Sequence, residues 1–248
     1  MTGALAPLLE LSGVADALAS ARDAVDQALR HPALRRAGGR VAAEIGLRSA
    51  VASATLDGHG YPLDEVRAGT VTDAVVQGAL RVTRELDGLA PLWPKVPRQV
   101  LARLHLLSAR DTVPPAALGR PSDDGAVPRL HALFDLVTTE SGAPALLLAA
   151  VVHAELASLR AFAGPNGVLA RAAARLTLVS GGLDPRGLIA PDLGHLAREP
   201  EYVGALGAYA TGTPDGLRAW FRHYASAATA AAEEAVTVGD EVLAQAGP

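Results

Sequence analysis

The chain has 248 residues, a formal net charge of −4 and no cysteine. The lack of cysteine excludes disulfides, thiolate metal sites and cysteine nucleophiles, and the dispersed, slightly acidic charge offers no basic patch to nucleic acid or an anionic membrane. Half of the residues are hydrophobic but only 4% are aromatic, which favours one large domain of closely packed helices with thin side chains between them.

Apolar residues at helical spacing dominate the first half of the chain. The predicted helices span residues 14–29, 33–56, 71–86 and 97–108. Glycines end the second helix at Asp57-Gly58-His59-Gly60 and the third at Asp87-Gly88. The prolines between 91 and 97 exclude a continuous helix there, and Pro97 suits the first turn of the fourth.

The second half is also predicted to be helical. Its predicted helices span residues 127–139, 144–159, 166–179, 201–210 and 214–238. Residues 111–126 are rich in proline, glycine, serine and aspartate, so we expect an exposed loop there, with at most a short β-hairpin. The fold class predicted from these patterns is all-α.

Two features bear on location. The N-terminus lacks the basic region and apolar stretch of a secretory signal. The longest apolar run, 143–152, is shorter than the roughly 20 residues that cross a bilayer. We therefore expect a cytoplasmic protein with no membrane partner.

The segment 159–171 is the most informative part of the sequence. A glycine-containing loop there leads into the N-terminus of a predicted helix, where free N–H groups and the helix dipole favour an anion. Most such junctions are only helix caps, so these residues alone leave both interpretations open.

This segment resembles the motif of the Fic family, His-Pro-Phe-x-Asp/Glu-Gly-Asn-Gly-Arg-x-x-Arg. Phe162, Asn166, Gly167 and Arg171 stand where the motif has Phe, Asn, Gly and the second Arg. The resemblance extends to most of the chain, including an apolar helix that ends in a His-Ala-Glu sequence, the helix before the family's flap, and the closing helices. It implies a Fic (Fido) helical bundle, with the flap at 111–126.

A second motif lies upstream. Ser53, Asp57 and Gly58 resemble the family's inhibitory Ser/Thr-x-x-x-Glu-Gly/Asn motif, with Asp in place of Glu. In the family this carboxylate pairs with the second Arg of the active motif and blocks productive nucleotide binding. The resemblance therefore implies a contact between Asp57 and Arg171, and the shorter Asp leaves a water-filled gap as the alternative.

Several of the family's catalytic residues are missing. Arg160 replaces the catalytic His, and a guanidinium cannot act as a base. Gly164 replaces the acidic residue that holds Mg²⁺, Pro165 replaces the next Gly, and Val168 replaces the first Arg, a phosphate contact. The base, the metal ligand and the phosphate clamp are thus absent together.

We therefore expect a catalytically silent protein without cofactor or metal, which binds a protein or a small ligand. The alternative is a diverged transferase or lyase that acts on an anionic substrate with Arg160 as electrostatic stabiliser. A homo-oligomer and a purely structural role in an assembly remain open. We expect a single domain over 1–248, divided into N-terminal helices 1–96, a Fic core 97–182 and C-terminal helices 183–248. The candidate anion-binding residues are Arg160, Asn166, Gly167 and Arg171.

Other polar residues of the sequence offer alternative sites. His153, two helical turns before Arg160, is a conceivable substitute base, but a hydrogen-bonded helix residue is the preferred interpretation. The remaining histidines lack metal-ligand spacing. Arg171 and Arg175 lie one turn apart and offer a phosphate clamp, although a pairing of Arg171 with Asp57 is preferred.

Overall fold

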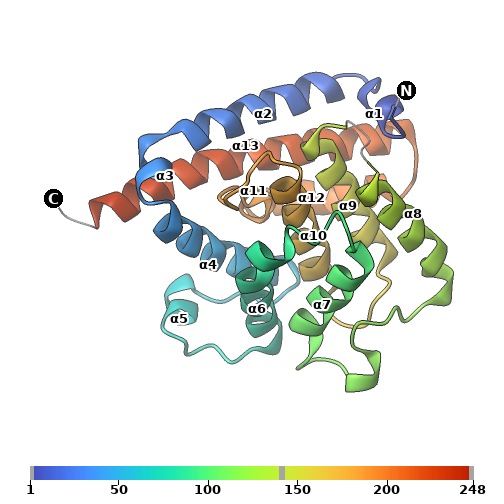
Figure 1. The fold of residues 1–248 in the computed structure, drawn as a ribbon, viewed down its shortest axis with the longest axis horizontal. Coiled ribbons are helices and arrows are strands. Elements are labelled where there is room, and N and C mark those ends of the chain that lie inside the picture. Colours follow the sequence, from blue (N-terminus) through green and yellow to red (C-terminus); the bar gives the residue numbers. More distant parts are fainter. Residues whose placement is uncertain (1–2, 140–142, 246–248) are drawn as a thin grey trace.

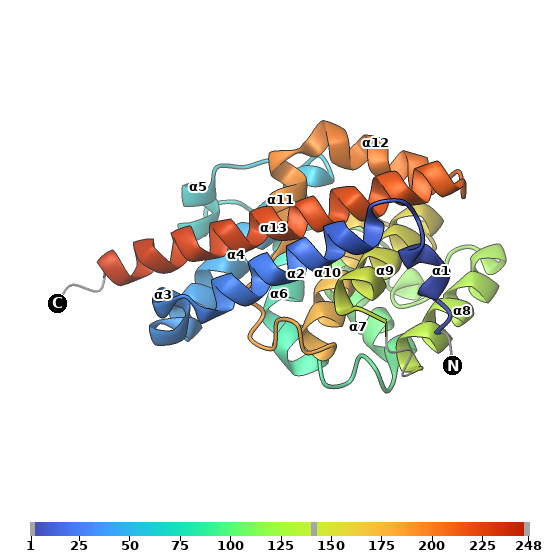
Figure 2. The same ribbon diagram turned by 90° about the horizontal axis from the view of Figure 1, so that it is seen from above.

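The computed structural model describes residues 3–139 and 143–245. Within these ranges the chain is helical and forms no strand, which confirms the all-α prediction. Two long helices, α2 (Val14–Arg30) and α13 (Pro214–Ala244), run side by side in the same direction along one side of the molecule (Figures 1 and 2). The apolar stripe predicted on α2 is the buried one, because Val14, Leu18 and Val25 are at most 3% exposed.

The centre of the fold is a hairpin of α9 (Ala145–Leu159) and α10 (Asn166–Ser180) (Figure 1). Helix α9 is apolar on nearly every side, and α10 is buried at every residue from Val168 to Leu178. A helix that is apolar all round is stable only when other helices surround it. The hairpin is therefore the scaffold against which the other helices pack.

The remaining α-helices complete two hydrophobic cores that share α9 and α10. They are α1 (Ala6–Leu9), α3 (Pro32–Arg36), α4 (Gly38–Leu56), α5 (Leu63–Arg67), α6 (Ala74–Leu89), α7 (Pro97–Ala109), α8 (Val127–Thr138), α11 (Pro191–Ala197) and α12 (Glu199–Tyr209). Each core holds one fully buried tryptophan whose N–H finds an acceptor. Trp93 donates to Thr177 Oγ1 at 2.9 Å, and Trp220 donates to the Ala150 carbonyl at 2.9 Å.

Two helix predictions in the first half need correction. The predicted helix 33–56 is divided into α3 and α4 at Ala37, whose φ of −113° departs from helical values just before two glycines. The predicted helix 71–86 starts later, because the Asp73 side chain caps α6 by accepting the N–H groups of Val75 and Val76. It also continues through the predicted stop at Asp87-Gly88 to Leu89, since one glycine weakens a helix without ending it.

The loop 111–126 forms no hairpin. It contains the short 3₁₀ helices η1 (Pro115–Ala117) and η2 (Asp124–Ala126), because its prolines remove the donors that a strand pairing would need. His105 ties this loop to the segment before α10, since its Nδ1 accepts the Gly119 N–H at 2.8 Å and its Nε2 lies 2.7 Å from the Ala163 carbonyl. The predicted flap segment thus packs onto the Fic-like motif.

No helix in residues 3–139 and 143–245 combines the length and hydropathy needed to cross a bilayer. The single-domain prediction over 1–248 includes residues 1–2, 140–142 and 246–248, which lie outside the described ranges. That prediction, with its internal division at 96 and 182, stays a prediction.

Candidate functional site

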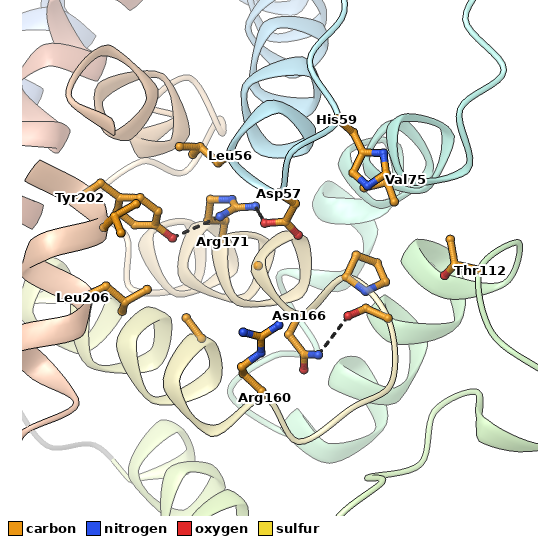
Figure 3. A pocket seen from close by; sticks show the side chains of 15 residues that line it. Leu56, Asp57, His59, Val75, Thr112, Arg160, Asn166, Arg171, Tyr202 and Leu206 are labelled. Carbon is orange, nitrogen blue, oxygen red and sulfur yellow. Dashed lines mark hydrogen bonds and ion pairs between the residues drawn. The ribbon is translucent and has the colours of Figure 1, made fainter. Parts of the chain in front are cut away.

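A cavity of about 610 Å³ lies where the C-terminal end of α4 meets the N-terminal end of α10 (Figure 3). Apolar side chains from α4, α6, α9 and α12 line part of it, and the rest is polar. The polar side chains that line it are Asp57, His59, Thr112, Arg160, Asn166, Arg171 and Tyr202. The structure therefore brings both sequence motifs to a single cavity.

Arg171 is the buried polar centre of this site, with its side chain only 2% exposed. Its Nη2 donates to Asp57 Oδ1 at 2.6 Å and to the Ser53 carbonyl at 2.7 Å, its Nε donates to Ser53 Oγ at 2.8 Å, and its Nη1 donates to the Tyr202 hydroxyl at 3.1 Å. Burial by itself lowers the pKa of this guanidinium, but Tyr202, Asp57 and Asp192 outweigh it and raise the pKa. Arg171 therefore stays charged in the fold.

Asp57 confirms the contact expected from the two motifs, and no gap separates its carboxylate from Arg171. Its second oxygen accepts the N–H of Val168 at 3.2 Å, so the carboxylate sits on the N-terminal end of α10. A Cβ at Gly167 would collide with this carboxylate, so glycine is required for the close approach of α4. The positive end of α10 is thus occupied by an anion from the chain itself.

Asn166 and Phe162 hold the loop before α10 in shape. The Asn166 side chain accepts the Phe162 N–H at 3.1 Å and donates to the carbonyls of Phe162 at 2.6 Å and Gly164 at 3.1 Å. Phe162 is 6% exposed, and its ring lies 4.9 Å from that of His105. Gly164 supplies a φ of 84°, which suits a residue without a side chain.

Arg160 differs from every other motif residue in its surroundings. Its side chain is exposed, lines the cavity and makes no hydrogen bond or ion pair with the part of the chain that the structure describes. Its φ of 47° places it in the left-handed region, where an L residue is strained. The α9 helix ends at this residue, and its charge faces the cavity beside Asn166 (Figure 3).

The sequence reasoning missed the pairing of His59, which lines the cavity, with Asp73 behind it. His59 lines the cavity, and its Nδ1 lies 2.9 Å from Asp73 Oδ2. Burial raises the pKa of the Asp73 carboxyl, but the Val76 N–H and His59 outweigh it and lower the pKa below its usual value. Asp73 before an apolar run is a helix-cap signal, but the distance to His59 follows only from the fold.

Behind Arg171 lies a second set of polar groups, Ser49 of α4, Arg175 of α10 and Asp192 of α11, a helix that was not predicted. Asp192 lies 3.7 Å from Arg171 Nε, and its Oδ2 accepts the Ser49 hydroxyl at 3.0 Å. Arg175 donates to the same Ser49 oxygen at 3.0 Å and does not line this cavity. Arg171 and Arg175 therefore do not form the phosphate clamp that their spacing allowed.

His153 is 1% exposed and lies 3.0 Å from the Tyr202 hydroxyl, in agreement with the hydrogen-bonded helix residue that we preferred. Burial, then the charge of Arg171 and His223, lowers its pKa well below the usual value. His195 Nδ1 and His223 Nε2 form a further buried pair at 3.0 Å. Among the described residues, no three acidic or histidine side chains are grouped so that they could hold a metal ion.

Gly164, Pro165 and Val168 occupy the positions where the family motif has its acidic residue, its next Gly and its first Arg. Gly164 and Pro165 line the cavity, whereas the Val168 side chain is 2% exposed and buried in the core. Gly58 turns the chain after α4 with a φ of 89°. None of these side chains can supply a carboxylate or a guanidinium to the cavity.

Comparison with known proteins identifies the fold. Neither protein-family models nor curated proteins match the sequence. Among solved structures, Fic-1 (residues 134–508) from C. elegans matches with a TM-score of 0.72 and 19% identity, over 95% of this chain and 75% of that one. A Fic family protein from Desulfovibrio desulfuricans G20 matches with a TM-score of 0.74 and 18% identity, over 91% of this chain and 74% of that one. The chain has the Fic fold.

Proposed function

We propose that this chain is a catalytically silent Fic-fold protein that uses the cavity between α4 and α10 to bind a ligand. The observation that carries the proposal is the set of groups facing that cavity. Arg160 stands where the family has its catalytic His, and Gly164 stands where it has the acidic metal ligand. Neither side chain can take a proton from a hydroxyl or coordinate Mg²⁺.

The size of the cavity favours a small ligand over a purely structural role. About 610 Å³ lies within the range of small-molecule sites, roughly 300 to 1,000 Å³. Its walls combine apolar side chains with Arg160, whose charge has no partner among the described residues. The favoured ligand is therefore a small molecule with an apolar part and a negative group placed near Arg160.

Asp57 argues against a nucleotide with a fully seated phosphate chain. Its carboxylate already accepts Val168 N–H and Arg171, the donors that an anion at the α10 N-terminus would use. A phosphate there would meet a negative charge and would have to displace it. We expect ATP with Mg²⁺ to bind only in the millimolar range or not at all, and to raise the melting temperature little.

A thermal-shift screen over nucleotides and small organic anions tests the proposal. The expected result is a shift with an anion that disappears in Arg160→Ala, with little effect of ATP and Mg²⁺. A shift of several degrees at modest ATP concentrations would contradict the inference that this cavity does not bind ATP with Mg²⁺ tightly. Arg160→His supplies a base without a metal ligand, so this variant should also remain inactive in AMP transfer.

One observation favours a diverged transferase or lyase as second candidate. The imidazole of His59 is oriented by Asp73, as a general base needs, and lines the same cavity as the free guanidinium of Arg160. An activity found by substrate screening that is lost in both His59→Gln and Arg160→Ala would support this function. Binding without any turnover would support the silent protein.

A further inference from the structure

A second cavity, of about 570 Å³, lies between α4, α6 and the C-terminal half of α10. It shares no lining residue with the first cavity. From α4 it is lined by four small residues, Gly39, Ala42, Ala43 and Gly46, which leave room that larger side chains would fill, and by Leu47. Other parts of its wall are apolar, formed by residues such as Val66, Leu80 and Val179.

Four arginines line this cavity, against a single acidic lining residue, Asp87. Arg67 is neutralised by Glu44 at 2.8 Å. Arg186 donates to the backbone carbonyls of Leu34 at 2.8 Å and Leu29 at 3.3 Å, and no carboxylate of the described chain lies in ion-pair distance. Arg84, exposed on α6, likewise has no ion pair within the described ranges.

Arg175, the fourth arginine, is only 6% exposed. Its Nη1 donates to Ser49 at 3.0 Å and its Nη2 to the Gly187 carbonyl at 3.1 Å, both neutral groups. Its Nε meets no acceptor among the described residues. A buried guanidinium without a directly bonded carboxylate is costly, and an anion nearby would offset that cost.

The acidic group behind these arginines is already engaged. The Asp184 carboxylate accepts the N–H groups of Leu188 at 3.0 Å and Ile189 at 2.6 Å, and it acts on Arg175 and Arg186 only from beyond ion-pair distance. The cavity therefore concentrates guanidinium groups in a protein whose net charge is −4. Such a concentration attracts an anion.

We propose that this second cavity binds an organic phosphate, with the phosphate among Arg84, Arg175 and Arg186 and the organic part against the apolar wall. Guanidinium groups match phosphate oxygens in geometry and bind them by charge-assisted hydrogen bonds. The apolar walls and the volume suit a ligand with a small apolar body, which inorganic phosphate lacks.

Titration calorimetry with hexyl phosphate, 1-hexanol and inorganic phosphate tests the proposal on the whole chain. Hexyl phosphate should bind saturably and more tightly than either of the other probes. Arg84→Glu should weaken its binding by roughly tenfold or more, since it replaces an attraction by a repulsion. Ala43→Leu, which fills the cavity without changing a charge, should weaken binding as well.

Two charge-matched controls separate this site from general electrostatics. Arg35→Glu on α3 and Arg22→Glu on α2 change the same charge outside both cavities. Neither should change the affinity by more than about twofold. The proposal is overturned if hexyl phosphate shows no saturable binding, if a control weakens it as much as Arg84→Glu, or if hexanol or inorganic phosphate binds equally well.

Discussion

The two sides of the first cavity differ in how firmly their charged residues are held. On the α4 side, Arg171 is buried and bonded to Ser53, Asp57 and Tyr202. On the loop side, Arg160 is exposed, has no partner among the described residues and occupies a strained backbone conformation. The first arrangement maintains the fold, whereas the second leaves a charge available to a ligand. Retention of a motif residue can therefore reflect stability as readily as chemistry.

Removal of Arg171 should give the largest effect, because it breaks the firmly held side. Arg171→Met leaves the Asp57 and Asp192 carboxylates without their guanidinium, and we expect a loss of roughly 3–5 kcal/mol in the free energy of unfolding. Arg160→Ala, the matched change on the loop side, should alter it by less than about 0.5 kcal/mol. Urea unfolding of both variants measures the difference, and equal losses would contradict the comparison.

Acid should next weaken the buried groups packed behind Arg171, which include His153 and His195. Burial, followed by neighbouring charges that include Arg171, lowers the pKa of His153 and His195 well below the usual value. Below about pH 6.5 the unfolded chain therefore binds protons that the folded chain does not, so stability falls with pH by about 1.4 kcal/mol per pH unit for each histidine. Asp184 acts in the opposite sense, since burial raises its pKa to about 6 and the folded chain takes up a proton there first.

Unfolding measured from pH 7.5 to 5.5 checks this expectation, together with the NMR signals of the two rings. The free energy of unfolding should decrease towards acid while neither ring titrates in the folded state. Ring signals that titrate near pH 6.5 without loss of stability would show that these histidines are accessible to protons.

A smaller change tests whether the close approach of α4 depends on glycine. The Cβ of Gly167→Ala would collide with Asp57, so the carboxylate must move from Arg171 and the α10 N-terminus, at about 1–3 kcal/mol. Gly204→Ala on α12 meets open space and should instead stabilise by up to about 1 kcal/mol. Thermal unfolding of the pair gives the sign of each change, and a stabilised Gly167→Ala would contradict the packing described.

The smallest expected effect lies on the loop side. Arg160→Gly removes the strain of a left-handed residue and should raise the free energy of unfolding by roughly 1 kcal/mol. The same variant should lose any anion binding in the first cavity. Arg160→Ala, which keeps the strain, provides the comparison, and equal stability of the two variants would show that the backbone is not strained there.

Sequence reasoning predicted the central helices and the contact between Asp57 and Arg171, because periodicity and motif order carry that information. It missed α11, because its seven residues make only about two turns, too few for apolar residues to repeat at helical spacing. It also missed the pairing of His59 with Asp73, which depends on how the loop after α4 returns to α6. Short helices and contacts between loops are set by tertiary packing, which local patterns do not report.

The central proposal is that this chain is catalytically silent for reasons beyond the Asp57 contact. The direct measurement is the transfer of labelled AMP from ATP with Mg²⁺, to the protein itself and to bait proteins. Both the native chain and Asp57→Gly, in which the carboxylate that sits on α10 is removed, should be assayed. We predict no incorporation by either protein, because Arg160 and Gly164 still replace the family's catalytic His and metal ligand. Robust incorporation by either one would contradict the account.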